Sequence, residues 1–328
     1  MGRSTRQLAA SIVMTCLFVV QGTSQNRFTE EPVAIGSGWW ELPGTLTVPA
    51  GAGKVPAVVL VHGSGPHDRD ETVGPNKLFR DLAWGLANAG VAVLRYEKRT
   101  REYKDRVAEI PGFTVQHETI EDALLAVAAL RGRDRIDSGR IFVIGHSLGG
   151  MLAPRIAGAD ARIAGLVILA GPTRPFPQLV VEQMEYLGMP DGGVIDPKLA
   201  LAALKHEATR VMDPALSLDV PASELLMELP ASYWRDLNAY HPEEAAARLR
   251  IPMLILQGER DYQVTLTDLG GWENALRGRA NVTIKTYPGL NHQFMTGTGQ
   301  SRPAEYNIPG HVSDEVIADI ASWIARQP

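Results

Sequence analysis

The chain has 328 residues, of which 45% are hydrophobic and 21% are charged, and its formal net charge is -5 at pH 7. A chain of this length and apolar content forms one large domain with an insertion, or at most two domains. It has neither a long basic run nor a strongly basic balance, so we expect no nucleic-acid partner.

The first residues have the pattern of a secretory signal peptide. Arg3 and Arg6 precede an apolar stretch over residues 8–20, which is too short for a comfortable transmembrane span. We therefore expect residues 1–24 to be a signal peptide, cleaved near residues 22–25, and the mature protein to be secreted or periplasmic. After cleavage we expect no stable membrane insertion, and the alternative is an uncleaved N-terminal anchor.

The only cysteine, Cys16, lies inside this segment. The mature protein would therefore contain no thiol, which excludes disulfides, cysteine catalysis and thiolate metal sites. The residues before Cys16 fit a lipid-attachment signal poorly, so we do not expect lipidation.

Strands alternate with helices along most of the remaining chain. In chain order the patterns predict a hairpin over 33–48, strands over 55–61, 91–95, 140–144, 163–170, 251–257 and 281–287, and helices over 78–89, 118–130 and 314–326. Continuous apolar runs such as Val55–Val61 are typical of strands that are buried on both faces. The alternation indicates an α/β protein with a mainly parallel sheet and helices on both faces.

The segment between Gly171 and Pro242 breaks this alternation. It has no strand pattern and carries proline-bounded helical stretches over 177–187, 197–211 and 223–229. We expect a helical cap over residues 172–242, inserted between core segments 25–171 and 243–328. Its methionine and aromatic side chains can line an apolar acyl pocket, or they can simply pack the cap onto the core.

The hexapeptide Gly-His-Ser-Leu-Gly-Gly at 145–150 carries the clearest chemical signal. It stands between a strand pattern and a helix pattern, as a G-x-S-x-G turn with Ser147 at its apex. A side chain on Gly145 or Gly149 would collide with the neighbouring strand and helix. We predict that Ser147 is a nucleophile and that the N–H of Leu148 binds an oxyanion; the alternative is a turn that only packs the helix closely.

A serine nucleophile needs a base, and the base needs a carboxylate that orients it. In an open α/β sheet such groups lie beyond the carboxyl ends of strands, and Asp261 and His292 each follow a late predicted strand. The chain order Ser147, Asp261, His292 is the order known for the α/β-hydrolase fold. Glu259 is the alternative acid, although a solvated turn or an ion pair with Arg260 suits it better.

The other histidines fit the role of base less well. The His146 side chain is expected to point away from the nucleophile into the supporting structure. No other histidine stands in a loop straight after a late strand, and this set comprises His62, His67, His117, His206, His241 and His311.

The loop over 62–70 follows the first buried strand and is expected to supply the second oxyanion donor. We predict that this donor is the N–H of Ser64, with Gly65 as the alternative. The loop lacks the spacing of a phosphate-binding P-loop. Its histidine and acidic residues can in principle bind a metal. We instead expect no metal and no cofactor, and an ion-paired turn formed by Asp68, Arg69 and Asp70.

Five motifs stand in a consistent order: H-G-S-G-P-x-D-R-D-E at 62–71, R-Y-E-K-R at 95–99, G-H-S-L-G-G at 145–150, Q-G-E-R-D-Y-Q-V at 257–264 and Y-P-G-L-N-H at 287–292. Together they resemble the bacterial α/β-hydrolase esterases related to dienelactone hydrolases, over about residues 33–328. The resemblance implies an α/β-hydrolase fold and a carboxylesterase with Ser147, Asp261 and His292 as its triad. Family members usually read R-Y-D-K-R-G where this chain has R-Y-E-K-R-T, a departure that concerns the shape of that loop.

The expected function is a serine carboxylesterase that hydrolyses small esters with short to medium acyl groups through an acyl-enzyme. A peptidase or thioesterase with the same triad is the alternative, because fold and triad do not set the leaving group. A non-catalytic binding protein of the same fold is the alternative from another class. The expected partner is a small-molecule ester, and the sequence indicates no oligomeric state.

Overall fold

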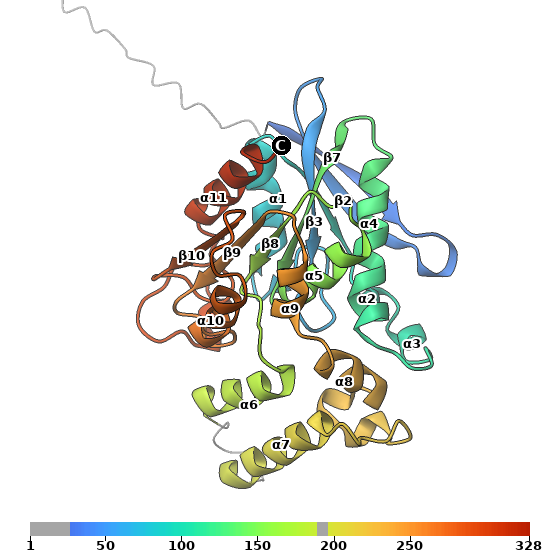
Figure 1. Cartoon of the computed structure of the whole chain (residues 1–328), viewed down its shortest axis with the longest axis vertical. Coiled ribbons are helices and arrows are strands. Elements are labelled where there is room, and N and C mark those ends of the chain that lie inside the picture. Colours follow the sequence, from blue (N-terminus) through green and yellow to red (C-terminus); the bar gives the residue numbers. More distant parts are fainter. Residues whose placement is uncertain (1–26, 189–195) are drawn as a thin grey trace, which may run out of the picture.

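An eight-stranded sheet with the order β1-β2-β6-β3-β7-β8-β9-β10 forms the centre of the protein (Figure 1). The computed structural model describes residues 27–188 and 196–328, so the predicted signal peptide lies outside the described residues. The strands are β1 (Phe28–Ile35), β2 (Leu42–Pro49), β3 (Val55–Val61), β6 (Ala92–Tyr96), β7 (Ile136–His146), β8 (Gly165–Leu169), β9 (Met253–Gly258) and β10 (Val282–Tyr287). β2 pairs antiparallel with β1 and β6, and all later neighbours pair in parallel.

Both faces of this sheet are buried, which explains its continuous apolar strands. In β3 the side chains of residues 57–61 are all fully buried, and they alternate between two apolar cores. Ala57, Val59 and Val61 face one core, whereas Val58 and Leu60 face the other, because successive side chains of a strand point to opposite faces. The mainly parallel, double-covered sheet predicted from the sequence is therefore confirmed.

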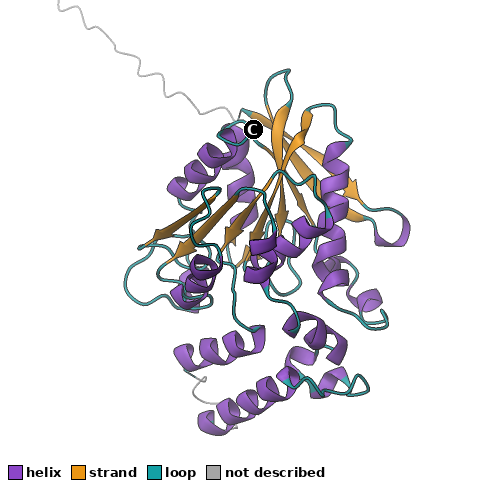
Figure 2. Ribbon diagram, viewed as in Figure 1, coloured by secondary structure: helices purple, strands orange, loops and turns teal. Residues whose placement is uncertain are grey.

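Helices form the two outer layers (Figure 2). The core on one face includes residues of α1 (Leu78–Asn88) and α11 (Asp314–Ala325). The core on the other face includes residues of α4 (Glu121–Arg131), α5 (Leu148–Ala159), α9 (Pro242–Arg248) and α10 (Leu266–Ala275). Short segments complete the body: α2 (Arg99–Glu102), α3 (Lys104–Val107), the π-helical turn η2 (Gln116–Ile120), and the small hairpin of β4 (Thr72–Val73) and β5 (Asn76–Lys77). Within the part of the chain that the structure describes, no helix is both long and apolar enough to span a membrane.

The segment between β8 and β9 carries helices that stand apart from these layers. Figure 1 shows α6 (Phe176–Leu187), α7 (Pro197–Met212) and α8 (Ala231–Asn238) gathered beyond one end of the sheet. The stretch predicted as a helix over 223–229 forms two 3-10 turns instead, η3 (Ala222–Glu224) and η4 (Leu226–Glu228). Met227 has a φ of 56°, which interrupts any regular helix at this point.

Close backbone contacts require the glycines on either side of Ser147, Gly145 at the end of β7 and Gly149 at the start of α5. A Cβ atom on Gly145 would lie 2.2 Å from the carbonyl oxygen of Gly149, and one on Gly149 would lie 2.2 Å from that of Val61. These oxygens belong to the backbone of a buried strand and helix, so they cannot move aside as a flexible side chain would. The collisions expected from the sequence are confirmed.

Gly145→Ala is therefore expected to lower the free energy of unfolding by about 2–4 kcal/mol, because the added methyl group overlaps backbone atoms. Urea unfolding followed by circular dichroism measures this change. Gly158→Ala is the matched control, since Gly158 lies in the adjoining helix α5 and its Cβ would meet no atom within 4 Å. That variant is expected to gain about 0.5–1 kcal/mol. Equal stability of the two variants would contradict the packing argument.

Candidate active site

Ser147 stands at the junction of β7 and α5 in a strained backbone conformation. Its φ is 53° and its ψ is -120°, a combination that residues other than glycine rarely adopt. Its N–H donates to the carbonyl oxygen of Leu169 in β8 at 2.9 Å, which fixes the turn to the sheet. The residue is half-buried. A strained strand-to-helix turn of this kind presents a serine hydroxyl at the carboxyl edge of the sheet.

Asp261 and His292 meet at the same edge, although 31 positions separate them in the sequence. Asp261 lies in the loop after β9 and His292 in the loop after β10. The His292 Nδ1 and Asp261 Oδ2 atoms lie 2.6 Å apart, and both residues are only 5% exposed. The alternative acid Glu259 instead accepts a hydrogen bond from the Thr286 hydroxyl at 2.7 Å. Arg260 pairs with Glu305, so the ion pair expected between Arg260 and Glu259 does not form in the described structure.

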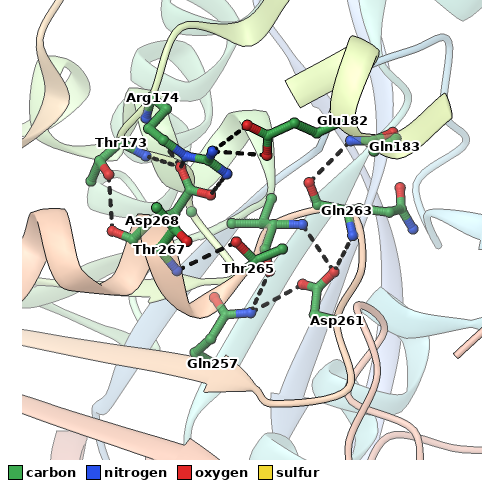
Figure 3. Close-up of polar contacts among 12 residues, drawn as sticks. Thr173, Arg174, Glu182, Gln183, Gln257, Asp261, Gln263, Thr265, Thr267 and Asp268 are labelled. Atoms are coloured by element: carbon green, nitrogen blue, oxygen red, sulfur yellow. Dashed lines mark hydrogen bonds and ion pairs between the residues drawn. The ribbon is translucent and has the colours of Figure 1, made fainter. Parts of the chain in front are cut away.

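The Asp261 carboxylate is held in a single orientation (Figure 3). Its Oδ1 accepts the backbone N–H groups of Gln263 and Val264 at 2.7 and 3.0 Å. Its Oδ2 accepts from Gln257 Nε2 at 3.1 Å as well as from His292. Oδ1 is thus bound by two N–H groups of its own loop and Oδ2 by a side chain of β9, which orients the carboxylate toward His292.

His146 connects the turn at Ser147 to the loop that carries His292. Its Nε2 donates to the carbonyl oxygen of His292 at 2.9 Å, and the two rings lie 4.6 Å apart between centroids. Its Nδ1 lies 3.2 Å from Glu71 Oε2. Burial alone would lower the pKa of His146, but the Glu71 carboxylate outweighs it and raises that pKa. The His146 side chain thus points into the supporting structure, as the sequence predicted.

The structure brings Ser147, Asp261 and His292 to one edge of the sheet, but they do not all contact one another. Among the described residues, no hydrogen bond joins the Ser147 hydroxyl to the His292 ring. Such a bond is often long or poorly aligned without substrate and tightens only when substrate binds. The link that is present runs from Ser147 through its neighbour His146 to His292 and Asp261.

The loop after β3 lies directly against Ser147. A Cβ atom on Gly63 would lie 3.1 Å from the Cβ of Ser147, so only a glycine fits comfortably here. Within residues 27–188 and 196–328, the N–H groups of Ser64 and Leu148 have no backbone or side-chain acceptor. Leu148 opens helix α5, where the first N–H groups are free by geometry. Neither amide is thus bound by another group of the described protein.

The acidic turn that follows this loop is anchored differently from the expectation. Asp68, Arg69 and Asp70 form their contacts with residues outside the turn rather than with one another. Asp68 accepts hydrogen bonds from Thr72, Arg69 pairs with Glu97, and Asp70 pairs with Lys77 and Arg95. The loop is thereby fastened to the end of β6. In the part of the chain described, no group of three or more histidine, cysteine or acidic residues is placed to hold a metal ion.

A cavity of about 640 Å³ lies between this loop and the cap. Ser64, Gly65 and Pro66 form its wall on the side of the loop. The rest of the wall comes from the body and from the cap. Its charged residues are Lys104, Glu118 and Glu228, and its apolar and aromatic residues include Val107, Ile110, Phe113, Phe176, Met227, Leu229 and Tyr233. Of the cap's aromatic residues, Phe176 and Tyr233 line this cavity, whereas Trp234 is fully buried in the core.

Polar contacts fasten the cap to α10 and to the loop that carries Asp261 (Figure 3). The chain enters the cap at Arg174, whose N–H and guanidinium both donate to the buried carboxylate of Asp268 in α10. Arg174 also pairs with Glu182 of α6 at 2.6 Å. The next residue of α6, Gln183, donates to the carbonyl oxygen of Gln263 at 3.1 Å, within the loop that carries Asp261.

Comparison with known proteins places this arrangement in a family. A model of the alpha/beta hydrolase family matches residues 58–307. The esterase EstD of Thermotoga maritima is 42% identical over 299 residues, which span 91% of this chain and 68% of that protein.

Two solved structures share the fold. Est1E from Butyrivibrio proteoclasticus matches with a TM-score of 0.56 at 17% identity, over 90% of this chain and 99% of that one. A dienelactone hydrolase-like protein from Klebsiella pneumoniae matches with a TM-score of 0.52 at 19% identity, over 92% and 100% of the two chains. The resemblance predicted from the motifs is confirmed. The chain therefore belongs to the alpha/beta hydrolase family, and it is an esterase by its homology to EstD.

Proposed function

We propose that this protein is a serine carboxylesterase in which Ser147 is the nucleophile, His292 the general base and Asp261 the residue that orients the base. The observation that carries the proposal is the buried 2.6 Å contact between His292 Nδ1 and Asp261 Oδ2, beside a serine in a strained turn. A carboxylate at Nδ1 keeps that nitrogen protonated and leaves Nε2 free to accept a proton.

The proposed reaction has two steps, acylation of Ser147 and hydrolysis of the acyl-enzyme. His292 Nε2 takes the proton of the Ser147 hydroxyl while the serine oxygen attacks the ester carbonyl, and the N–H groups of Leu148 and Ser64 bind the resulting oxyanion. The imidazolium returns its proton to the leaving alcohol, and an acyl-enzyme forms. Water then loses a proton to His292, attacks the acyl carbon and releases the acid, and the proton returns to Ser147.

The substrate proposed for this site is a small ester with an apolar acyl or alcohol group. The cavity beside Ser64 has a volume of about 640 Å³, within the usual range for small-molecule sites. Phe113, Phe176 and Leu229 in its wall favour hydrocarbon over charged groups. The amide and thioester alternatives use the same triad, so only rates on matched substrates separate them.

A fluorophosphonate probe and a matched substrate panel test the proposal together. The probe is expected to form a covalent adduct on Ser147, located by peptide mass spectrometry. Among a butyryl ester, its thioester and an aminoacyl anilide, the ester is expected to have the highest kcat/KM. Folded protein without an adduct would indicate a binding protein, and a preference for the anilide would indicate a peptidase.

A further inference from the structure

The peptide unit between Gly63 and Ser64 is held by a buried ammonium group. Lys98 follows β6, and its Nζ donates to the carbonyl oxygen of Gly63 at 2.7 Å. On the other side of the same residue, the N–H of Gly63 donates to Glu71 Oε1 at 2.6 Å. Buried charges thus bind both polar groups of Gly63, and the loop cannot rotate without breaking charge-assisted hydrogen bonds.

This peptide unit also carries the proposed oxyanion donor. In a planar trans peptide the C=O of one residue and the N–H of the next belong to the same conjugated group and point in opposite directions. With Lys98 at the carbonyl oxygen of Gly63, the N–H of Ser64 points away from the ammonium group. Ser64 lines the cavity, and the adjoining Gly63 lies against Ser147, so the Ser64 N–H belongs to the loop that contacts the proposed nucleophile.

The ammonium group of Lys98 is fixed by a chain of contacts that ends in the cap. Lys98 Nζ lies 2.6 Å from Glu118 Oε1, and Glu118 Oε2 accepts the hydroxyl proton of Tyr233 at 2.6 Å. Lys98, Glu118 and Tyr233 are 2%, 6% and 3% exposed. Burial, reinforced by the Glu118 carboxylate, raises the pKa of the Tyr233 phenol well above its ordinary value, so the phenol stays a donor.

We propose that Lys98 is a positioning residue of the oxyanion hole, held in place by Glu118 and by Tyr233 of the cap. This inference rests on the proposed function of Ser147 and Ser64. The ammonium group withdraws electron density through the Gly63 carbonyl, which makes the N–H of Ser64 a stronger donor. This hydrogen bond from Ser64 strengthens most when the substrate oxygen carries a full negative charge. The ammonium group of Lys98 therefore stabilises the transition state more than the bound substrate.

The arrangement also gives the cap a role in the chemistry. Tyr233 and Glu118 line the same cavity as Ser64, so one chain of hydrogen bonds runs from the cap wall to the oxyanion donor. A change at the cap end of this chain alters the rate through the position of Lys98, without any direct contact to the reacting carbonyl.

Lys98→Met is expected to lower kcat by about 10- to 100-fold while KM changes by less than about threefold, because the lost interaction acts only in the transition state. Lys98→Arg keeps a cation and is expected to recover part of the rate. Tyr233→Phe keeps both charges and is expected to lower kcat by only about two- to fivefold. Lys54→Met is the matched control, since Lys54 is exposed just before the amino end of β3 and is expected to leave both constants unchanged.

A second variant separates the catalytic effect from a folding defect. Lys98→Met alone leaves the Glu118 carboxylate buried without its partner, which destabilises the fold. The double variant Lys98→Met, Glu118→Gln removes both charges and is expected to unfold at a urea concentration closer to that of the wild type. Its kcat is nevertheless expected to stay low, since the ammonium group is still missing. Recovery of wild-type kcat in the double variant would overturn the inference.

Inhibitor affinities distinguish a positioning role of Lys98 from a purely structural one. The affinity for a trifluoromethyl ketone, which forms a tetrahedral oxyanion on the serine, is expected to fall in parallel with kcat/KM across the Lys98 variants. The affinity for the product acid is expected to stay constant. Unchanged affinity for the ketone in Lys98→Met, in a protein whose Ser147→Ala variant is inactive, would refute the role of Lys98 and leave the proposed esterase intact.

Discussion

Ser147→Ala is expected to lower kcat/KM for p-nitrophenyl butyrate by about 10⁴- to 10⁶-fold. Without the hydroxyl no acyl-enzyme can form, and the remaining donors can only bind the ester and assist attack by water. Steady-state hydrolysis measures the loss, and the same variant is expected to give no fluorophosphonate adduct. Binding of the product acid is expected to persist, because the cavity and both amide donors are unaltered.

The variant should keep its fold, so the loss can be read as chemistry. The contact that fixes the turn is the backbone hydrogen bond from Ser147 to Leu169, which alanine retains. Ser138→Ala makes the same substitution at the opposite end of β7, where the residue is exposed. Both variants are expected to unfold within about 0.5 kcal/mol of the wild type, and only Ser147→Ala is expected to lose activity. Turnover by Ser147→Ala within about tenfold of the wild type would exclude the proposed mechanism.

The sheet and the loops of the site could be predicted from the sequence because their signals are local. Strands buried on both faces are continuous apolar runs, and the predicted strand over 55–61 coincides with β3. In a parallel sheet the carboxyl ends meet at one edge, so Ser147, Asp261 and His292 were expected near one another once each was assigned to the end of a strand. Their catalytic roles remain predictions, whereas the contact between Asp261 and His292 is seen directly.

The buried charges around the oxyanion loop could not be predicted in this way. Lysine and glutamate are almost always exposed, so a sequence pattern gives no reason to bury Lys98 and Glu118. Their partners are distant in the chain: Gly63 is 35 positions from Lys98, and Tyr233 is 115 positions from Glu118. No periodicity connects such positions. The one signal in the sequence is that Lys98 lies within the R-Y-E-K-R motif, and this motif indicates a family resemblance rather than a buried lysine.

The helix α10 was missed for a different reason. It contains Gly270 and Gly271, and glycine has a low helix propensity. The structure explains Gly271, because a Cβ atom there would lie 2.3 Å from the hydroxyl oxygen of Thr173 at the entrance to the cap. Tertiary packing therefore favours a residue that local propensity disfavours. The sequence did not predict helix α8, because α8 follows the irregular turns around Met227 and is too short to show a clear hydrophobic periodicity.

Asp261→Asn is expected to lower kcat by about 10⁴-fold, and the surrounding donors explain why so small a change has so large an effect. Asp261 Oδ1 accepts two backbone N–H groups, so the asparagine must place its oxygen there. Its NH₂ group then faces His292 Nδ1 and the Nε2 donor of Gln257. The histidine can satisfy this NH₂ group only by accepting at Nδ1, which moves the ring proton to Nε2.

A His292 ring protonated at Nε2 cannot take the proton of the Ser147 hydroxyl, so acylation is the step that fails. Rapid-quench measurement of acylation is expected to show the loss, while KM changes by less than about threefold. Glu259→Gln is the matched control, because Glu259 binds Thr286 rather than the histidine and its amide keeps an acceptor for that hydroxyl. Loss of acylation in Glu259→Gln, with normal acylation in Asp261→Asn, would assign the orienting carboxylate to Glu259 instead.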